Sequence, residues 1–375
     1  MSEEKKFRLL ISCGGTGGHF NPGLGIAKYL NQTGNESMLL LGGKHAEAQM
    51  KISADAGVRA ESFDYHRPGK NLLQMLKFLR SVLRGIRFSR KLIREFQPDA
   101  LLIMGSSISL PAALGAWSMK TPIFLHDGNA RVGKANRVLS RLAKGLALSF
   151  PAVNSKTLHC PCELTGLPLR QALIDGGELP KAEAIQKLNE LFGSDFTADA
   201  PTLLVFGGSL GALKINSSFI MPQDEPEMKK LQVIHLTGPG KLEELTEQYK
   251  TFPGKYILRE ASGEMGVIYS AVDAVICRSG GSTVSELAFF GKYALLIPFP
   301  YAAEHHQDDN ALYLASGGGA EVLFDADCSV EKMQDFVRRF LADPEKIRTL
   351  GANSRKLAFP DAAGAVIRMI QKNIN

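Results

Sequence analysis

The sequence predicts an α/β protein made of two doubly wound parallel-sheet domains, and three observations support this prediction. Short apolar strands alternate with longer amphipathic segments, which is the pattern of parallel sheets covered by helices. Two glycine-rich loops, residues 14–19 and 207–211, each follow a predicted strand and open a predicted helix. The length of 375 residues suits about two domains, each with its own core.

The predicted strands fall into two series, separated by a polar stretch over residues 175–200. The first series is Leu9–Cys13, Met38–Leu41, Ala100–Met104, Ile123–Leu125 and Leu146–Phe150. The second series is Thr202–Phe206, Val233–Thr237, Tyr256–Leu258, Ala274–Cys277 and Ala294–Pro298. We place the boundary at Gly166-Leu167-Pro168, which gives domains over 1–166 and 167–359. Ligands of such domains bind outside the carboxyl ends of the strands.

Composition and charge are those of a globular protein in a reducing compartment, for which the cytoplasm is the default. Five cysteines, an odd number spread over the chain, are not the pattern of a disulfide framework. The charged start, Met1 to Arg8, lacks the apolar segment of a signal peptide, and no apolar run reaches the roughly 18 residues of a membrane span. The net charge of +6 is modest and matters mainly where it is concentrated.

Neither glycine loop has the spacing of a dinucleotide-binding loop. Counted from Gly15 and Gly17, the third glycine position holds Phe20, and in the second loop Ser209 replaces the middle glycine. A nicotinamide cofactor is therefore not expected. Glycines that lead into a helix still let the backbone approach a bulky anion at the positive end of the helix dipole.

A third loop, residues 277–286, lies between a predicted strand and a predicted helix. Its sequence Cys-Arg-Ser-Gly-Gly-Ser-Thr-Val-Ser-Glu indicates a nucleotide pocket, in which Gly280 and Gly281 admit phosphates and Glu286 accepts hydrogen bonds from ribose hydroxyls. The alternative is a capping box, Thr283-x-x-Glu286, which serves helix stability alone. The C-terminal helix pattern over 363–374 has its own N-cap candidate, Asp361.

The segment 70–94 is a predicted amphipathic helix that is basic and has no acidic residue. Its basic residues are Lys70, Lys77, Arg80, Arg84, Arg87, Arg90, Lys91 and Arg94. Such a helix can lie on an anionic membrane with its apolar residues at the interface. The alternative is an apolar stripe that packs on the sheet beside a solvated basic face. A nucleic-acid surface would also be basic, but no binding motif accompanies this one.

Two short motifs invite a metal interpretation that we do not adopt. His159-Cys160-Pro161-Cys162 and His305-His306 each lack a second ligand pair at suitable spacing, so buried thiols and surface histidines explain them. Asp308-Asp309 lies on a predicted helix and does not form an Asp-x-Asp motif beside a strand end. We expect no metal site.

Five motifs, in order and at compatible spacing, together resemble the MurG family of N-acetylglucosaminyltransferases, glycosyltransferase family 28. They are Gly-Gly-Thr-Gly-Gly-His ending at His19, Gly-Gly-Ser-Leu-Gly-Ala at 207–212, Cys-Arg-Ser-Gly at 277–280, Thr-Val-Ser-Glu at 283–286 and His-Gln-x-x-Asn-Ala at 306–311. The similarity runs along almost the whole chain.

The resemblance implies a GT-B fold, in which two Rossmann-like domains face a cleft. It implies transfer of GlcNAc from UDP-GlcNAc to the 4-hydroxyl of MurNAc in lipid I, with inversion, to form lipid II and UDP. The N-terminal domain would take the acceptor and the membrane, the C-terminal domain would take UDP-GlcNAc, and helix 360–375 would pack back on the N-terminal domain. We expect no cofactor and no nucleic acid.

The family's site residues carry over onto matching positions. Substrate contacts would come from Thr16, Gly17, Gly18, Asn129, Arg170, Ser209, Leu210, Gly211, Ser262, Met265, Ser282, Thr283, Glu286, His306, Gln307 and Asn310, with His19 and Asn129 as catalytic residues. Ser209 would bind the diphosphate, Glu286 the ribose and Gln307 the GlcNAc hydroxyls, while uracil would lie near the backbone of 262–265. A neutral imidazole suits His19 as proton acceptor. The alternatives are that His19 caps its helix or binds the acceptor diphosphate.

A lipid-linked acceptor is met at the bilayer, so we favour the membrane interpretation of segment 70–94. This predicts a peripheral protein at the cytoplasmic face of the cell membrane, beside cell-wall assembly proteins. Departures from the family pattern cluster on the acceptor side, at residues 105–111 and at Asp127-Gly128, and Leu210 replaces a glutamine. Other functions that fit the fold are a sugar-nucleotide epimerase, a related glycolipid transferase and a noncatalytic UDP-sugar-binding protein.

Overall fold

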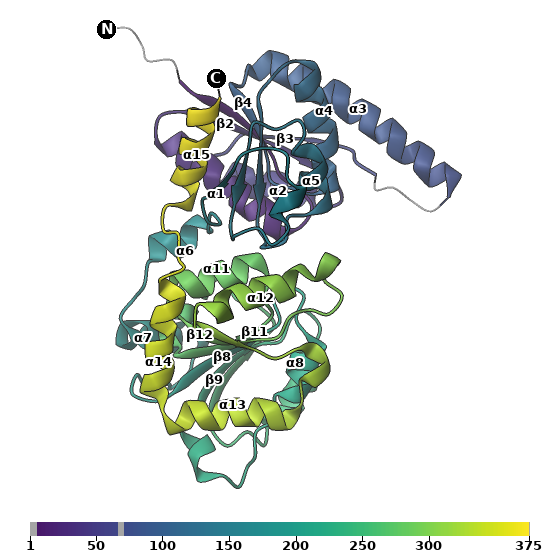
Figure 1. Cartoon of the computed structure of the whole chain (residues 1–375). Helices are drawn as coiled ribbons and strands as arrows, with labels where there is room; N and C mark the ends of the chain where they lie inside the picture. The colour runs from purple at the N-terminus through teal and green to yellow at the C-terminus, as the bar shows by residue number, and fades with distance from the viewer. Residues whose placement is uncertain (1–5, 67–70, 375) are drawn as a thin grey trace. The chain divides into compact units, whose positions relative to one another are not determined.

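The computed structural model describes residues 6–66 and 71–374, and the chain divides into two compact units. The first unit runs to Arg170 and also contains the C-terminal segment from Asp361, while the second unit comprises Gln171–Pro360. The division falls a few residues after the boundary predicted at residue 166. Each unit is built on one parallel sheet (Figure 1).

The first unit has a seven-stranded parallel sheet in the order β3-β2-β1-β4-β5-β6-β7. The strands are β1 Arg8–Ser12, β2 Glu36–Gly42, β3 Ala60–Phe63, β4 Ala100–Ile103, β5 Ile123–Asp127, β6 Gly145–Leu148 and β7 Cys162–Leu164. The helices are α1 Gly17–Gln32, α2 Ala46–Asp55, α3 Leu72–Phe96, α4 Leu110–Ser118, α5 Lys134–Leu139 and α15 Ala362–Asn373, with short 3-10 turns at Ser107–Ser109 and Ser155–Thr157. Neighbouring strand residues point to opposite faces, so Leu10 packs with α3 and α4, whereas Leu9 and Ile11 pack with α1 and α15. Helices on both faces explain why the central strands are apolar throughout.

The second unit has a six-stranded parallel sheet in the order β10-β9-β8-β11-β12-β13. The strands are β8 Thr202–Phe206, β9 Gln232–Leu236, β10 Lys255–Arg259, β11 Ala274–Cys277, β12 Tyr293–Leu296 and β13 Ala320–Val322. The helices are α6 Gln171–Gly176, α7 Lys181–Phe192, α8 Leu213–Ser218, α9 Leu242–Tyr249, α10 Met265–Ala271, α11 Gly281–Phe289, α12 His306–Ser316, α13 Val330–Ala342 and α14 Pro344–Arg355, with 3-10 turns at Pro226–Lys230, Ala303–His305 and Asp325–Asp327. Leu203 and Val205 of β8 pack with α8, α9, α13 and α14 in one buried core.

Every predicted strand is present, which confirms the α/β fold class, and the strands that the sequence does not predict lie at sheet edges. These are β3, β7 and β13. Each is short and carries a glutamate, Glu61, Glu163 or Glu321, and the residues of β7 are all exposed. An edge strand has a partner on one side only and is less enclosed, so it does not need the apolar run by which a central strand is recognised.

The C-terminal helix α15 packs against α1 through Val366, Ile367 and Ile370. Asp361 stands at its N-cap position as predicted, but within the described structure its side chain makes no capping hydrogen bond. The carboxylate lies over Gly364 and pairs with Arg368 at 2.8 Å instead. The predicted position is therefore correct and the predicted capping contact is wrong.

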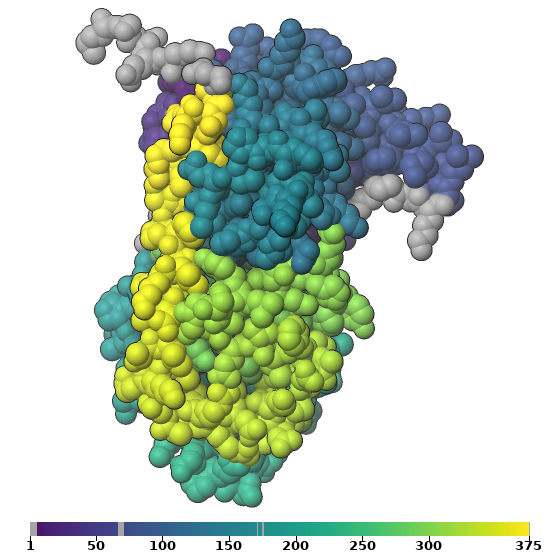
Figure 2. All heavy atoms as spheres, viewed as in Figure 1, coloured from purple at the N-terminus to yellow at the C-terminus, as the bar shows by residue number. Residues whose placement is uncertain are grey.

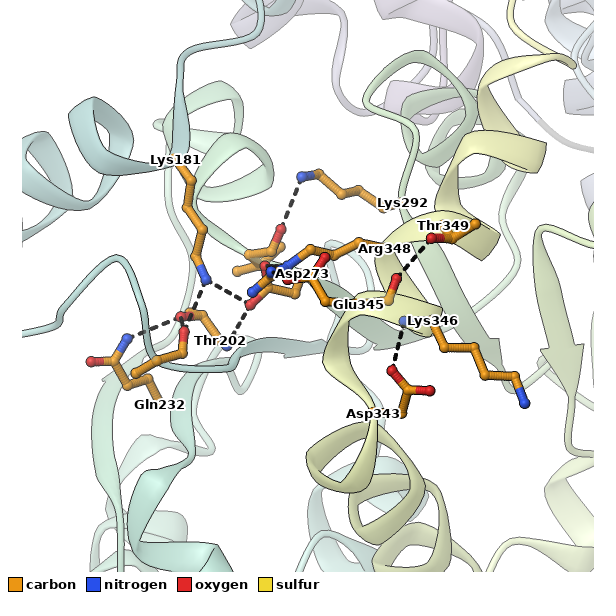
Figure 3. A network of polar contacts seen from close by, with 12 residues as sticks. Lys181, Thr202, Gln232, Asp273, Lys292, Asp343, Glu345, Lys346, Arg348 and Thr349 are labelled. Atoms are coloured by element: carbon orange, nitrogen blue, oxygen red, sulfur yellow. Dashed lines mark hydrogen bonds and ion pairs between the residues drawn. The ribbon is translucent and has the colours of Figure 1, made fainter.

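A buried ion-pair network fixes the amino ends of the strands in the second unit (Figure 3). Asp273, just before β11, accepts hydrogen bonds from Lys181 Nζ at 2.7 Å, from the backbone N–H of Thr202 at 2.9 Å and from Arg348 Nε at 2.8 Å. These contacts join α7, β8 and α14 at the end of the sheet where the strands begin. Asp273 is buried while Lys181 and Arg348 are partly exposed, so the two cations compensate a carboxylate that would otherwise be costly to bury. The second glycine loop lies at the opposite, carboxyl end of this sheet.

Candidate active site

The first glycine loop leaves β1 and enters α1 with an exposed first turn. Gly15 has φ +88°, and a Cβ on Gly14 would lie 3.1 Å from the backbone N of Gly42, so the loop runs tightly over the sheet edge. Thr16, Gly17 and Gly18 are exposed at the N-terminus of a 16-residue helix. This end of α1 suits an anion.

His19 is half-buried in the first turn of α1 and lies against the loop after β4. A Cβ built on Gly105, which has φ +95°, would lie 3.2 Å from Cε1 of His19 and 3.6 Å from Nδ2 of Asn136. The two side chains therefore flank one backbone position. Thr16 holds the N-cap position of α1, so His19 does not occupy it.

The predicted site residue Asn129 is held by a buried carboxylate that sequence reasoning did not select. Asp127 Oδ1 accepts the backbone N–H of Asn129 at 3.1 Å, and Oδ2 accepts the N–H of Gly133 at 2.9 Å and Nδ2 of Asn136 at 2.9 Å. Burial raises the pKa of Asp127, while these hydrogen bonds and the nearby His19 act in the opposite direction. Asp127, Asn136 and His19 thus belong to one polar cluster.

His126, next to Asp127, is a buried structural partner. Its Nε2 lies 3.3 Å from the carbonyl oxygen of Gly166 and 3.4 Å from Oγ of Ser149. Burial lowers the pKa of His126 to about 4, so this imidazole is neutral near pH 7.

The second glycine loop follows β8 and packs directly on the turn after β9. A Cβ on Gly211, which has φ +69°, would lie 2.8 Å from Cα of Gly238. Ser209 is exposed, and the side chain of Leu210 is 81% exposed. Lys241 Nζ donates to the carbonyl oxygen of Leu210 at 3.0 Å, which brings a positive charge to this loop. Sequence reasoning missed Lys241, although the glycine-rich turn that precedes it signals a loop at the same sheet edge.

A buried histidine fixes the helix that follows this loop. His235 Nε2 lies 3.1 Å from Oδ1 of Asn216, whose Nδ2 donates to the carbonyl oxygen of Thr237 at 2.9 Å. Since Oδ1 can only accept, Nε2 of His235 carries the hydrogen, and Nδ1 accepts from the Tyr249 hydroxyl at 2.8 Å. Burial lowers the pKa of His235 to about 3, so the imidazole stays neutral.

We expect His235 to make the protein less stable in acid. In the unfolded chain the pKa of a histidine is near its ordinary value of 6.5, whereas the pKa of His235 in the folded protein is about 3. Between these two pH values the unfolded chain therefore holds more protons than the folded protein. The free energy of unfolding should therefore fall by about 1.4 kcal/mol per pH unit on acidification from this residue. Urea unfolding of wild type and His235→Gln between about pH 4.5 and 7 measures the difference in slope. The exposed His159→Gln should keep the wild-type slope, and equal slopes for all three proteins would contradict the expectation.

The third loop places Glu286 in the core of the second unit, and the capping-box interpretation is wrong. Helix α11 begins at Gly281 with Gly280 as N-cap, so Thr283 lies inside the helix and cannot cap it. Glu286 is 7% exposed, and its Oε2 accepts the hydroxyl of the fully buried Tyr269 at 2.9 Å. A buried carboxylate is costly unless it is hydrogen-bonded, and the Tyr269 hydroxyl supplies such a bond.

The start of α12 is joined to this third loop. Ser279 Oγ donates to the backbone oxygen of Gln307 at 2.8 Å, and Nδ2 of the buried Asn310 donates to the backbone oxygen of Ser279 at 3.1 Å. Gln307 Oε1 accepts the backbone N–H of Phe299 at 3.0 Å, and Nδ1 of His306 lies 2.9 Å from the carbonyl oxygen of Ala303. The structure therefore brings the predicted residues of α12 to the loop that precedes α11.

The other predicted donor residues lie at separate places. Ser282 and Thr283 are half-buried in the first turn of α11. Ser262 follows β10, and its Oγ accepts the backbone N–H of Glu264 at 3.0 Å, just before the buried Met265 opens α10. Arg170 is the last residue of the first unit, whereas the remaining predicted donor residues are in the second.

The structure gives no support for metal binding by His159-Cys160-Pro161-Cys162 or by His305-His306. Over residues 6–66 and 71–374, no group of three or more His, Cys, Asp or Glu is arranged to hold a metal ion. Cys160 is half-buried and Cys162 is exposed, so the expectation of two buried thiols is wrong there, because Cys162 opens the exposed edge strand β7. Asp308 and Asp309 lie on α12, as predicted.

Helix α3 divides into a packed half and an exposed half. Its later residues Val82, Gly85, Ser89, Leu92, Ile93 and Phe96 are buried on the sheet side. Its first turns stand out from the rest of the first unit (Figure 2) and expose Leu72, Leu73, Met75, Leu76, Leu79 and Leu83. We call residues 72–84 the α3 arm. The packing alternative thus accounts for only part of the helix, and Lys70 lies outside the described residues.

The two doubly wound units, with their loops at the carboxyl ends of parallel strands, have the GT-B architecture of nucleotide-sugar glycosyltransferases. Residues 9–148 match the glycosyltransferase family 28 N-terminal domain, and residues 202–366 match the glycosyltransferase family 28 C-terminal domain. The chain belongs to glycosyltransferase family 28.

Full-length relatives support this assignment. The UDP-N-acetylglucosamine--N-acetylmuramyl-(pentapeptide) pyrophosphoryl-undecaprenol N-acetylglucosamine transferase of Citrifermentans bemidjiense is 30% identical over 98% of this chain and 100% of its own. The protein of the same name from Geobacter metallireducens is 32% identical over 96% of this chain and 97% of its own. The crystal structure of Acinetobacter baumannii MurG matches with a TM-score of 0.75 and 25% identity over 98% of this chain and all of that one. A Neisseria meningitidis UDP-GlcNAc 2-epimerase has a TM-score of 0.67 at 14% identity, with 98% of this chain and 100% of that one covered, which shows a common fold alone.

Proposed function

We propose that the protein transfers GlcNAc from UDP-GlcNAc to the 4-hydroxyl of MurNAc in lipid I and so forms lipid II and UDP. The observation that carries this proposal is the match over nearly the whole length to relatives whose name states this transferase activity. The epimerase alternative has only a common fold in its favour. No described feature favours a binding protein over an enzyme.

The reaction is a displacement at the anomeric carbon. The acceptor oxygen forms a bond to that carbon, the bond from the carbon to the diphosphate oxygen breaks, and its electron pair leaves with UDP. The hydroxyl proton goes to a ring nitrogen of His19, for which a neutral imidazole is suited. Inversion follows from this single displacement.

The second unit would hold the donor. The loop over Ser209 and Gly211, with Lys241 beside it, would face the diphosphate, whose charge grows as UDP leaves. Glu286 would accept hydrogen bonds from the ribose hydroxyls, and Gln307 would contact the sugar. The first unit would hold the acceptor, with its diphosphate at the exposed first turn of α1.

A direct assay tests the proposed reaction. Purified protein receives UDP-GlcNAc with and without a lipid I analogue, and UDP release and the lipid product are measured. Release that requires the analogue and yields a disaccharide-linked product supports the proposal. UDP release without acceptor dependence would point to other chemistry at the donor site, and binding of UDP-GlcNAc without turnover would point to a binding protein.

The α3 arm is the proposed contact with an anionic membrane at the cytoplasmic face, where cell-wall assembly proteins would also act. None of the helices in the described ranges is long and apolar enough to cross a membrane. Leu72, Leu76, Leu79 and Leu83 recur at intervals of three and four residues, which aligns them as one exposed stripe. Lys77, Arg80 and Arg84 on the same turns would meet lipid phosphates.

We expect a Leu79→Glu/Leu83→Glu variant to lose membrane binding. Each exposed leucine that enters the lipid interface gains up to about 1.5–3 kcal/mol, so replacing two should lower vesicle affinity at least tenfold. Co-sedimentation with vesicles containing phosphatidylglycerol measures this, with pure phosphatidylcholine vesicles as the uncharged comparison. Leu191→Glu changes a similarly exposed leucine on α7 and should bind like wild type. Undiminished binding of the double variant would rule out the α3 arm as the contact.

A further inference from the structure

We propose that Asp127 is a positioning residue for the transfer reaction, whose carboxylate holds Asn129 in place and stabilises His19 after that imidazole has accepted the proton. The inference rests on the proposed function. It concerns a residue that does not itself contact the reacting atoms.

The carboxylate of Asp127 is the centre of the cluster in the first unit. It is the last residue of β5 and is 6% exposed. One oxygen accepts the N–H of Asn129, and the other accepts both the N–H of Gly133 and the side-chain amide of Asn136. Burial raises the pKa of Asp127, and the three donors act against that rise and fix the orientation of the carboxylate. The loop that carries Asn129 is thereby tied to the end of a rigid strand.

Asn136 connects this carboxylate to the position of His19. Its Nδ2 donates to Asp127 Oδ2 and to the backbone oxygen of His126, each at 2.9 Å, which fixes the orientation of the amide. Nδ2 of Asn136 and the ring of His19 flank the same backbone position at Gly105. Oδ1 of Asn136 is buried without a hydrogen-bond partner among the described residues, a cost that indicates that the amide is held for the sake of its donor side.

The charge that reaches His19 from this cluster is negative. His126 and Asp127, both on β5, interact electrostatically with His19. His126 is neutral near pH 7, since its pKa is lowered to about 4, so Asp127 supplies the charge. A buried carboxylate is screened less than a surface one and favours an imidazolium beside it. Proton transfer from the acceptor hydroxyl to His19 is therefore easier with Asp127 ionised.

The test compares the pH dependence of kcat/KM in wild type, Asp127→Asn and Asp127→Glu. His19 must be neutral to accept a proton, so activity falls on the acid side as it becomes protonated. The carboxylate favours that protonation, so removing its charge should move the acid limb, the fall of kcat/KM at low pH, to lower pH by roughly one unit. The plateau, the kcat/KM at the pH optimum, should fall about 10- to 100-fold. Asp127→Glu keeps the charge and should keep the limb, with a plateau about tenfold below wild type because the carboxylate is displaced.

Each outcome decides between the alternatives. A folded Asp127→Asn enzyme with a lower plateau and an unmoved limb would reduce Asp127 to a structural role and overturn the inference. If Asp127→Asn does not fold, Asp127→Ser takes its place, and a folded Asp127→Ser enzyme with an unmoved acid limb would overturn the inference. UDP-GlcNAc binding, which we place in the second unit, should be unchanged in both variants. Failure of wild type to transfer GlcNAc at all would reject the proposed function and the inference together, whereas an active wild type isolates the inference.

Discussion

The His19→Ala variant is expected to lose about 10²- to 10⁴-fold in kcat while its KM for UDP-GlcNAc stays close to wild type. A positioned proton acceptor acts as the transition state forms, so its loss appears in kcat and not in donor binding. His19 is half-buried in the first turn of α1, and its ring lies against Gly105. The measurement is the rate of lipid product formation at saturating UDP-GlcNAc and lipid I analogue.

The same experiment separates the two roles open to His19. If His19 binds the acceptor diphosphate instead, alanine should raise the KM for the lipid analogue and leave kcat near wild type. The matched control is His159→Ala, the same substitution at an exposed histidine of the same unit. Unchanged kcat and unchanged KM in His19→Ala would remove the residue from the site altogether.

The central strands could be predicted from the sequence, and the edge strands could not, for one physical reason. Strands such as Leu9–Ile11 or Leu101–Ile103 are covered on both faces, and only uninterrupted apolar residues satisfy that environment. Residues Cys162–Leu164 pair on one side and are exposed, so nearly any residues fit. Their place in the sheet depends on strand pairing, which is set by tertiary contacts rather than by the local sequence.

Some residues that the sequence nominated for the site, such as Thr16 and Ser209, lie in glycine-rich loops, which leave a readable pattern, and the others follow from family motifs. Asp127 and Asn136 are nine residues apart and leave no such pattern. Their contact exists only because the chain after β5 folds back as a loop and then begins α5. The Thr283-x-x-Glu286 pattern is the converse case, since its spacing fits a capping box but the helix begins three residues earlier than that box requires. Only the helix start decides between these interpretations.

The α3 arm illustrates what an amphipathic pattern alone leaves open. The apolar residues of segment 70–94 predict a helix with one apolar side, but not where the sheet beneath it ends. In the structure Ser81, Gly85 and Ser89 face the unit and leave room for close packing, so the bulky leucines of the first turns are turned to solvent. Small residues on the packed side of this helix therefore indicate that the leucines of its first turns are exposed and not part of the core.

Replacing Glu286 with glutamine is expected to raise the KM for UDP-GlcNAc about 10- to 100-fold, the effect of weakening a hydrogen bond to a charged acceptor. The carboxylate is buried, and one oxygen is engaged by the Tyr269 hydroxyl at 2.9 Å, so the carboxylate is held in one orientation. A preorganised carboxylate of this kind can accept from ribose hydroxyls without being reordered first. Steady-state kinetics with varied donor measure the change, and Glu247→Gln, an exposed glutamate on α9, serves as the matched control.

A donor that lacks the ribose 2′-hydroxyl turns this prediction into a test of the contact itself. Wild type should discriminate against the deoxy donor, because Glu286 then loses the hydrogen that it accepts. Glu286→Gln should discriminate much less between the two donors, because the substitution has already removed most of the interaction with the 2′-hydroxyl. The substitution and the deoxy donor together should therefore weaken donor use by less than the sum of their separate effects. If Glu286→Gln rejects the deoxy donor as strongly as wild type does, Glu286 acts through Tyr269 and α10 on the shape of the site, and another group reads the ribose.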